Sequence, residues 1–450
     1  MKKLLPLTLL LSTAAFANLH LAPPDFDTKG GRAVFVDIQS ARYDITYDVE
    51  EKVATVKSRL VFENKTPGLP VFDLIPTPRN AKLDGVSVKA PERKDPYGQK
   101  MRVLDRITAP GSHVLELENE ISRNVSFSPY NDSVRSAFWI RDLKGRKFLE
   151  QYVPSNYEFD QYQMTVTVTI TGTRRLKYDF FVNGELTQTA ANRWEIVYPS
   201  YFTVSSLYFH MAPKGSYRVL REEYTSVSGR KFPITTYTDY IFKTSKFMSY
   251  AKEVMAELEA DYGPWGHPSL VAYGTMPGGG MEHSGAAQTS LGALDHEMLH
   301  SYFAKGVMPG RGDDGWIDEA IASWRDYGYQ RLPTVGFDSS NLGNHSPYKR
   351  NTDDRCYVLG RAFMAYLDYR LQDVGGLKAF LRGYFAAYKH TVITTEHFKN
   401  NLAFFSGINF DEDFERYILS PETTTTTINV GQEENPYHQA LSDEELMNLL

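Results

Sequence analysis

Residues 295–300, with the sequence DHEMLH, restrict the fold and chemistry of this chain more than any other stretch. His296 and His300 are four residues apart, so both imidazoles lie on one face of a helix and can reach one metal ion. Glu297 lies beside them and can accept a proton from a water molecule that the metal polarises. Two partly exposed helical histidines would have the same spacing, so the motif alone only suggests a metal site.

A third ligand follows at a suitable distance. Glu319 lies in the segment 315–322, GWIDEAIA, and the eighteen residues 301–318 separate it from His300. Two histidines and a glutamate form a known catalytic zinc set that leaves the fourth position for water. A helical hairpin of this length can bring the start of its second helix back to the first. A solvated carboxylate in the first turn of a helix is the alternative interpretation of Glu319. We expect one Zn²⁺ per chain, bound by His296, His300 and Glu319.

The motif and its spacing resemble the aminopeptidase N family of gluzincin metallopeptidases. That family has H-E-x-x-H, then eighteen residues, then a Glu in the context W-L-N-E-G-F-A. Here Asp318 stands in place of the Asn and Ala320 in place of the Gly. The resemblance covers roughly residues 36–415 and implies a zinc aminopeptidase that acts on peptides. Most members also have a large helical C-terminal domain, and because residues 421–450 are too few to form one, we expect it to be missing here.

The GGMEH segment that begins at Gly279 resembles the exopeptidase motif G-x-M-E-N of the same family. The resemblance implies that Gly279, Gly280 and Met281 bind substrate, with the glycines allowing a close approach of the backbone. It also implies that Glu282 pairs with the free α-ammonium of the substrate. His283 stands where the family has Asn, and a GGxEH run is also similar to glycyl aminopeptidases. A glycine-rich turn with an exposed glutamate is the other interpretation.

The same resemblance implies two further site residues. Residues 355–362, RCYVLGRA, resemble the family segment Y-x-K-G-A, so Tyr357 would donate its hydroxyl to the oxyanion of the tetrahedral intermediate. Residues 148–155, FLEQYVPS, resemble the segment that supplies a second amine-binding side chain, here Gln151 or Glu150. A core aromatic and ordinary strand residues are the alternatives.

The first half of the chain has the pattern of β-strands. Residues 42–49 and 55–62 alternate between apolar and polar side chains, and residues 163–170 are rich in β-branched residues with period two. Asn183-Gly184 is a hairpin signal between two strand-like runs. We expect an N-terminal domain of antiparallel sheets over residues 18–212.

Helical spacing begins near residue 242. Residues 244–262 place apolar side chains on one face of a helix. Further helices are predicted over 294–304, 317–331, 359–372, 377–388 and 395–402, with a short strand at 269–273. With the resemblance, this pattern indicates an α+β multidomain protein with a thermolysin-like, mainly helical zinc peptidase domain over 213–420. The threonine-rich stretch after Pro421 predicts a linker and tail over 421–450.

The first seventeen residues have the features of a signal peptide. Lys2 and Lys3 precede a short apolar run, and a small-x-small site ends at Ala17. The run is too short to span a bilayer, although an uncleaved anchor is the alternative. We therefore expect cleavage after Ala17, export to the periplasm or the medium, and no stable membrane insertion afterwards.

Composition argues against a nucleic-acid-binding protein and against a disulfide-linked one. A net charge of −6 supplies no basic excess for binding a nucleic acid. Cys356 is the single cysteine, so an intrachain disulfide is impossible, and we expect a small buried side chain there. The sequence does not indicate the oligomeric state.

Two other functions remain open at the level of sequence. A zinc endopeptidase with an open cleft would lose little activity on substitution of Glu282, whereas an aminopeptidase would lose most of it. A zinc-containing periplasmic binding protein without turnover would not need Glu297, and structural zinc sites usually have four protein ligands.

Overall fold

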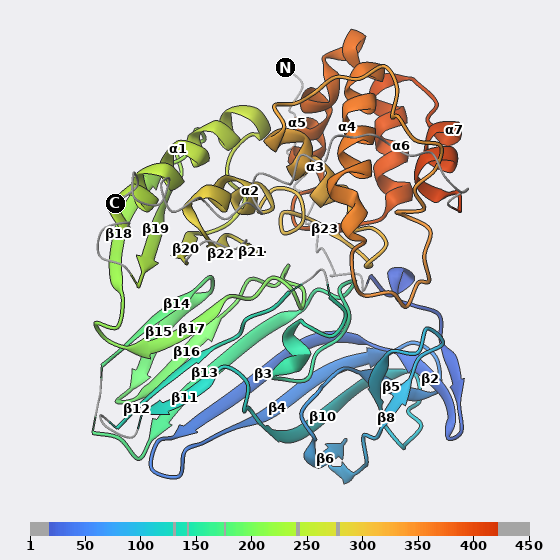
Figure 1. The fold of residues 1–450 in the computed structure, drawn as a ribbon. Helices are drawn as coiled ribbons and strands as arrows, with labels where there is room; N and C mark the ends of the chain where they lie inside the picture. The colour runs from blue at the N-terminus through green and yellow to red at the C-terminus, as the bar shows by residue number, and fades with distance from the viewer. Residues whose placement is uncertain are drawn as a thin grey trace, which may run out of the picture.

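The computed structural model describes residues 18–128, 132–141, 144–174, 177–239, 244–275 and 280–421. A β-rich N-terminal region is followed by a region that contains the helices, and Figure 1 shows the helices above the sheets of the first region. This order confirms the predicted β-rich first half and the helices after it. The signal peptide expected at residues 1–17 and the tail beyond residue 421 lie outside the described residues.

The largest sheet of the described residues lies in the lower part of Figure 1. Its strand order is β15-β16-β13-β3-β4-β10-β6-β7. Side chains of β4 alternate between buried and exposed, which explains the period of two in its sequence. The strands of this sheet are β3 Asp37–Asp48, β4 Val53–Asn64, β6 Arg79–Leu83, β7 Val86–Ser87, β10 Gly111–Glu120, β13 Gln163–Thr171, β15 Glu185–Ala190 and β16 Arg193–Val197. The prediction of antiparallel sheets fails at two pairs of this region. Strands β3 and β13 are parallel, and so are β2 Gly31–Phe35 and β5 Leu69–Phe72 of a smaller sheet.

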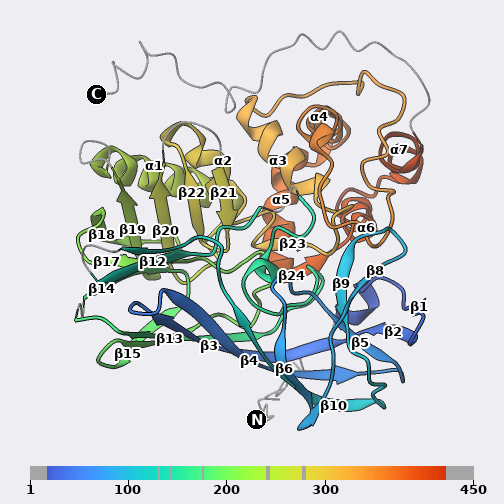
Figure 2. The same cartoon turned by 60° about the horizontal axis from the view of Figure 1, so that its bottom comes forward.

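Two smaller sheets complete the β-rich region. One has the order β1-β2-β5-β9-β8, with bounds Phe26–Thr28, Gly31–Phe35, Leu69–Phe72, Lys100–Val103 and Glu92–Lys94 in that order. The other has the order β11-β12-β17-β14, with bounds Val125–Ser128, Ser133–Ala137, Phe209–Pro213 and Tyr178–Val182. The second sheet shares a hydrophobic core with the largest sheet. Figure 2 shows it between that sheet and the strands β18 Arg218–Thr225, β19 Lys231–Thr238 and β20 Leu270–Gly274.

The prediction of a hairpin at Asn183-Gly184 is wrong. The strand before it, β14, pairs with β17, whereas the strand after it, β15, pairs with β16 in the largest sheet. Asn183 is buried, and its amide donates to the carbonyl oxygens of Ser206 and Ser284 at 2.8 Å. The Asn-Gly pair therefore carries the chain from one sheet to another instead of turning it back.

The later region combines a sheet with helices on one side of it. The sheet order is β18-β19-β20-β22-β21, with bounds Arg218–Thr225, Lys231–Thr238, Leu270–Gly274, Ala286–Thr289 and Gly280–His283. The helices are α1 Thr244–Tyr262, α2 Leu294–Leu299, α3 Trp316–Asp326, α4 Leu359–Arg370, α5 Gly376–Tyr388, α6 Thr395–Ser406 and α7 Asp411–Phe414. Strands β23 Val307–Pro309 and β24 Thr391–Ile393 form a small parallel pair.

Two predicted helices end earlier than their sequence pattern suggested. The helix predicted over 294–304 ends with α2 at Leu299, and a turn follows in which Ala304 has a φ of 129°. The helix predicted over 317–331 ends with α3 at Asp326, and Tyr329 has a φ of 56°. By contrast, α1 has the predicted bounds, with its predicted apolar face buried.

A buried arginine joins the β-rich region to the helical region. Arg350 pairs with Asp73 at 2.7 Å, Glu158 at 3.2 Å and Glu150 at 3.5 Å. These charges lie in the interior, where each one needs a partner to offset its lost hydration. No described helix is long and apolar enough to cross a membrane.

Candidate metal centre

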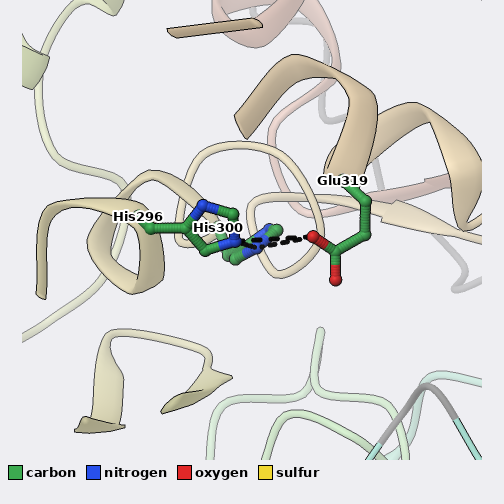
Figure 3. Close-up of side chains that lie close together, drawn as sticks. All are labelled: His296, His300 and Glu319. Carbon is green, nitrogen blue, oxygen red and sulfur yellow. Dashed lines mark hydrogen bonds and ion pairs between the residues drawn. The ribbon is translucent and has the colours of Figure 1, made fainter. Parts of the chain in front are cut away.

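The two histidines and Glu319 meet at the junction of α2 and α3. His296 lies in α2, His300 directly follows that helix, and Glu319 lies in the first turns of α3. Figure 3 shows the three side chains converging, with Glu319 reaching across from the second helix. The Nε2 atoms of His296 and His300 are 3.1 Å apart, and Glu319 Oε2 lies 3.4 and 3.5 Å from them. The three side chains are buried.

These distances suit zinc. Bonds of about 2.0–2.2 Å in tetrahedral geometry place two ligand atoms roughly 3.3–3.5 Å apart. Glu319 Oε2 is buried and lacks the geometry of a hydrogen bond to any group in the described part of the chain. A metal ion between the three atoms would satisfy this oxygen, so the donor set fits Zn²⁺.

The charges of the site also favour a cation. Burial alone would lower the pKa of both histidines. However, Asp326 and Glu319 raise the pKa of His296 well above its ordinary value, and Glu319 and Glu282 raise the pKa of His300 to about 10. Burial would raise the pKa of Glu319, but His300 and His296 hold it below its ordinary value. Buried carboxylates thus supply the negative charge that a bound dication needs.

Asp326 orients one ligand and was not predicted from the sequence. Its Oδ2 accepts a hydrogen bond from Nδ1 of His296 at 2.6 Å, which leaves Nε2 of that ring to face the metal position. Asp326 follows Glu319 by seven residues, about two helical turns, so both carboxylates lie on one face of α3. That spacing is the sequence signal that would have identified it. Nδ1 of His300 is 3.2 Å from the carbonyl oxygen of Phe303, which orients the second ring.

Glu297 lies against the backbone of β21. A Cβ atom added at Gly280 would come within 2.2 Å of Glu297 Oε1. Glycine at this position therefore leaves room for the carboxylate of Glu297. Gly279 lies outside the described residues.

Glu282 and Met281 lie on β21, which forms one edge of its sheet among the described strands. Glu282 is buried, and one of its oxygens lies within 4.8 Å of a ring nitrogen of His300. Nζ of Lys305 lies 3.2 Å from Glu282 Oε1. The structure thus brings the glutamate of the GGMEH segment next to the metal ligands and pairs it with a lysine.

Tyr357 reaches the same centre. It ends the short 3-10 helix Asp354–Tyr357 before α4, and its hydroxyl donates to Glu319 Oε1 at 2.9 Å. The preceding residue, Cys356, is buried as predicted.

Gln151 and Glu150 make other contacts. The amide nitrogen of Gln151 donates to the backbone carbonyl oxygens of Trp139, Lys147 and Phe148. Glu150 is buried beside Arg350. No contact recorded among the described residues links either side chain to the three metal ligands, and an amine-binding role for them stays a prediction.

No protein-family model and no curated protein matches the sequence. Among solved structures, Legionella pneumophila aminopeptidase A in complex with aspartic acid superposes with a TM-score of 0.60 at 13% identity. The match covers 84% of this chain and 49% of that one, so this chain spans about half the length of the Legionella enzyme.

Two further crystal structures match over nearly their whole length. An M1 zinc metallopeptidase from Deinococcus radiodurans has a TM-score of 0.58 and 16% identity, over 83% of this chain and 91% of that one. A mutant two-domain M1 zinc metallopeptidase bound to L-tryptophan has a TM-score of 0.59 and 16% identity, over 85% and 93%. At these identities the likeness shows a shared fold.

Proposed function

We propose that this protein is a zinc-dependent aminopeptidase that removes the N-terminal residue of peptides. The observation that carries the proposal is the meeting of His296, His300 and Glu319 at zinc-ligand distances, with Glu297 on the same helix. The shared fold with M1 zinc metallopeptidases, some of them bound to amino acids, supports it. The proposal includes a thermolysin-like catalytic domain over residues 213–420 behind a β domain over 18–212, in an exported protein.

Glu297 is the proposed general base. When bound, zinc would act as a Lewis acid that polarises water and the scissile carbonyl group. Glu297 would take a proton from the attacking water and pass it to the leaving amine. Tyr357, whose hydroxyl now bonds to Glu319, would donate to the oxyanion instead.

Substrate binding would use β21. An exposed strand edge can pair with an extended peptide through main-chain hydrogen bonds. Glu282 on this strand would pair with the α-ammonium of the substrate and so place the first peptide bond at the metal.

The test is a Glu297→Gln variant, which keeps the shape of the side chain but cannot accept the proton. We expect one bound zinc, as in the wild type, and turnover of alanyl-coumarin amide reduced about 100- to 10,000-fold. Zinc content is measured by mass spectrometry of the metal. The exposed Glu412→Gln is the matched control and should keep full turnover. A Glu297→Gln protein with unchanged turnover would contradict the proposed mechanism.

A further inference from the structure

A buried ion pair lies at the proposed amine site and joins three distant segments of the chain. Lys305 Nζ is 3.2 Å from Glu282 Oε1, and the two side chains are 2% and 5% exposed. The same ammonium donates to Ser205 Oγ at 3.1 Å. Glu282 comes from β21, Lys305 from the turn after the second histidine, and Ser205 from the β-rich region just before β17.

The turn after His300 fixes the position of Lys305. Ala304 has a φ of 129°, a conformation that L-residues rarely adopt and that costs of order 1–3 kcal/mol. The backbone N–H of Lys305 donates to the carbonyl oxygen of His300 at 2.8 Å, and its own carbonyl accepts from Ser284 Oγ at 3.3 Å. Lys305 is therefore tied directly to a metal ligand and to the residues that follow β21.

The charge of Lys305 affects how Glu282 can bind a second cation. A carboxylate has two oxygens and about four acceptor positions, so it can bind two ammonium groups at once. Lys305 occupies Oε1, and a substrate ammonium would need the remaining acceptor positions of the same group. A buried carboxylate that loses a paired cation loses part of what fixes its orientation and part of the compensation for its lost hydration.

We propose that Lys305 is a positioning residue for Glu282: it holds this carboxylate in the place where it binds the α-ammonium of the substrate. This inference rests on the proposed aminopeptidase function. The Lys305–Ser205 contact makes the β-rich region part of the amine site, although that region lies far from the zinc motif in sequence.

The test compares Lys305→Met in two backgrounds. With Glu282 intact, Lys305→Met should raise KM for alanyl-coumarin amide about tenfold or more, with kcat changed less than about threefold, because it weakens ground-state binding. With Glu282→Gln already present, the same substitution should change KM less than about threefold, because coupled residues are not additive. Propionyl-coumarin amide, which lacks only the amine, is tested as a competitive inhibitor, and Lys305→Met should leave its Ki unchanged. Lys389→Met, at an exposed position, is the control and should leave KM unchanged.

The outcomes separate the two proposals. A zinc-loaded wild type that cleaves no free-amine substrate overturns the aminopeptidase proposal and this inference with it. An active wild type in which Lys305→Met has equal effects in both backgrounds, or none, overturns the inference alone. If thermal unfolding shows that Lys305→Met does not fold, Ser205→Ala replaces it, with an expected KM increase of about threefold and no effect in the Glu282→Gln background. An unchanged KM for Ser205→Ala would then overturn the inference.

Discussion

Asp326 contacts a proposed metal ligand, His296, on the side of the ring away from the metal position. Its hydrogen bond fixes the tautomer and orientation of the His296 ring, and Arg325 beside it pairs with Asp295 at 2.9 Å and with Glu257 at 2.9 Å. Neighbouring residues of α3 thus orient a ligand of α2 and hold the two helices together. Carboxylates in this position typically contribute 10- to 100-fold to metal affinity.

We therefore predict that Asp326→Asn lowers zinc affinity about 10- to 100-fold, because an amide is a weaker acceptor for the imidazole N–H. Competition with a chelator of known affinity gives the dissociation constant. Asp373→Asn, at an exposed position, should leave the constant unchanged. Equal affinities of Asp326→Asn and wild type would show that the contact does not tune the metal.

The sequence predicted which residues meet at the centre, because helical spacing and an eighteen-residue separation impose local geometry. The meeting of His296, His300 and Glu319 could be predicted from these two spacings. Lys305 belongs to neither the HExxH motif nor the GGMEH segment, and its partner Ser205 comes from another region of the fold. Contacts of this kind depend on tertiary packing, which spacing along the chain does not encode.

The packing of α3 against α4 positions two site residues. A Cβ atom added at Gly360, in α4, would lie 2.7 Å from the Cβ of Ala320, in α3. Ala320 directly follows Glu319, and Gly360 is three residues after Tyr357. The close approach of these helices therefore sets the distance between Glu319 and Tyr357.

Gly360→Ala should lower the free energy of unfolding by about 1–3 kcal/mol through overpacking, and reduce turnover as well. Gly383→Ala is the matched control. Gly383 lies in α5 with no atom near the added Cβ, so alanine there should stabilise the protein by about 0.5–1 kcal/mol. Urea unfolding measures the free energy of unfolding of both variants. A Gly360→Ala protein as stable as the Gly383→Ala protein would contradict this account of the helix contact.

At the scale of elements, periodicity predicted where helices occur better than where they end. Helix α2 ends at Leu299, five residues before the positive φ of Ala304, and α3 ends at Asp326, two residues before Gly328, which has a φ of 77°. Periodicity continues past both ends and does not mark them. The Asn183-Gly184 pair has the sequence of a local turn, although the partners of the Asn183 side chain, Ser206 and Ser284, are remote in sequence.

For the whole molecule, strand order was the least predictable property. The parallel pairing of β3 with β13 joins segments separated by more than a hundred residues, and their alternation is the same in either direction. Alternation reports only which face of a strand is buried.

The stability of the whole chain should depend on Asp160, a buried residue before β13. Its Oδ2 accepts hydrogen bonds from the backbone N–H of Ile38 at 3.0 Å and from the amide of Asn156 at 2.7 Å. Burial, and then the neighbouring Asp37, raise the pKa of Asp160 to about 8. An aspartate in the unfolded chain titrates near pH 4. The protonated form therefore favours folding, and this contribution is lost as the pH rises from about 4 to 8.

Asp160→Asn imitates the protonated carboxyl and keeps its acceptor oxygen. We predict that it exceeds the wild type in unfolding free energy by about 1–3 kcal/mol at pH 8, and that the difference shrinks towards pH 5. Denaturant unfolding across this range measures it, with the exposed Asp27→Asn as the control. A difference that does not vary with pH would contradict the assigned titration.

The most direct test of the aminopeptidase assignment is mass spectrometry of a peptide of known sequence during incubation with protein that holds one zinc per chain. We predict that residues leave one at a time from the free N-terminus, that the N-acetylated peptide stays intact, and that Glu297→Ala protein releases nothing. Internal cleavage of both peptides, or no cleavage by the zinc-loaded wild type, would contradict the assignment.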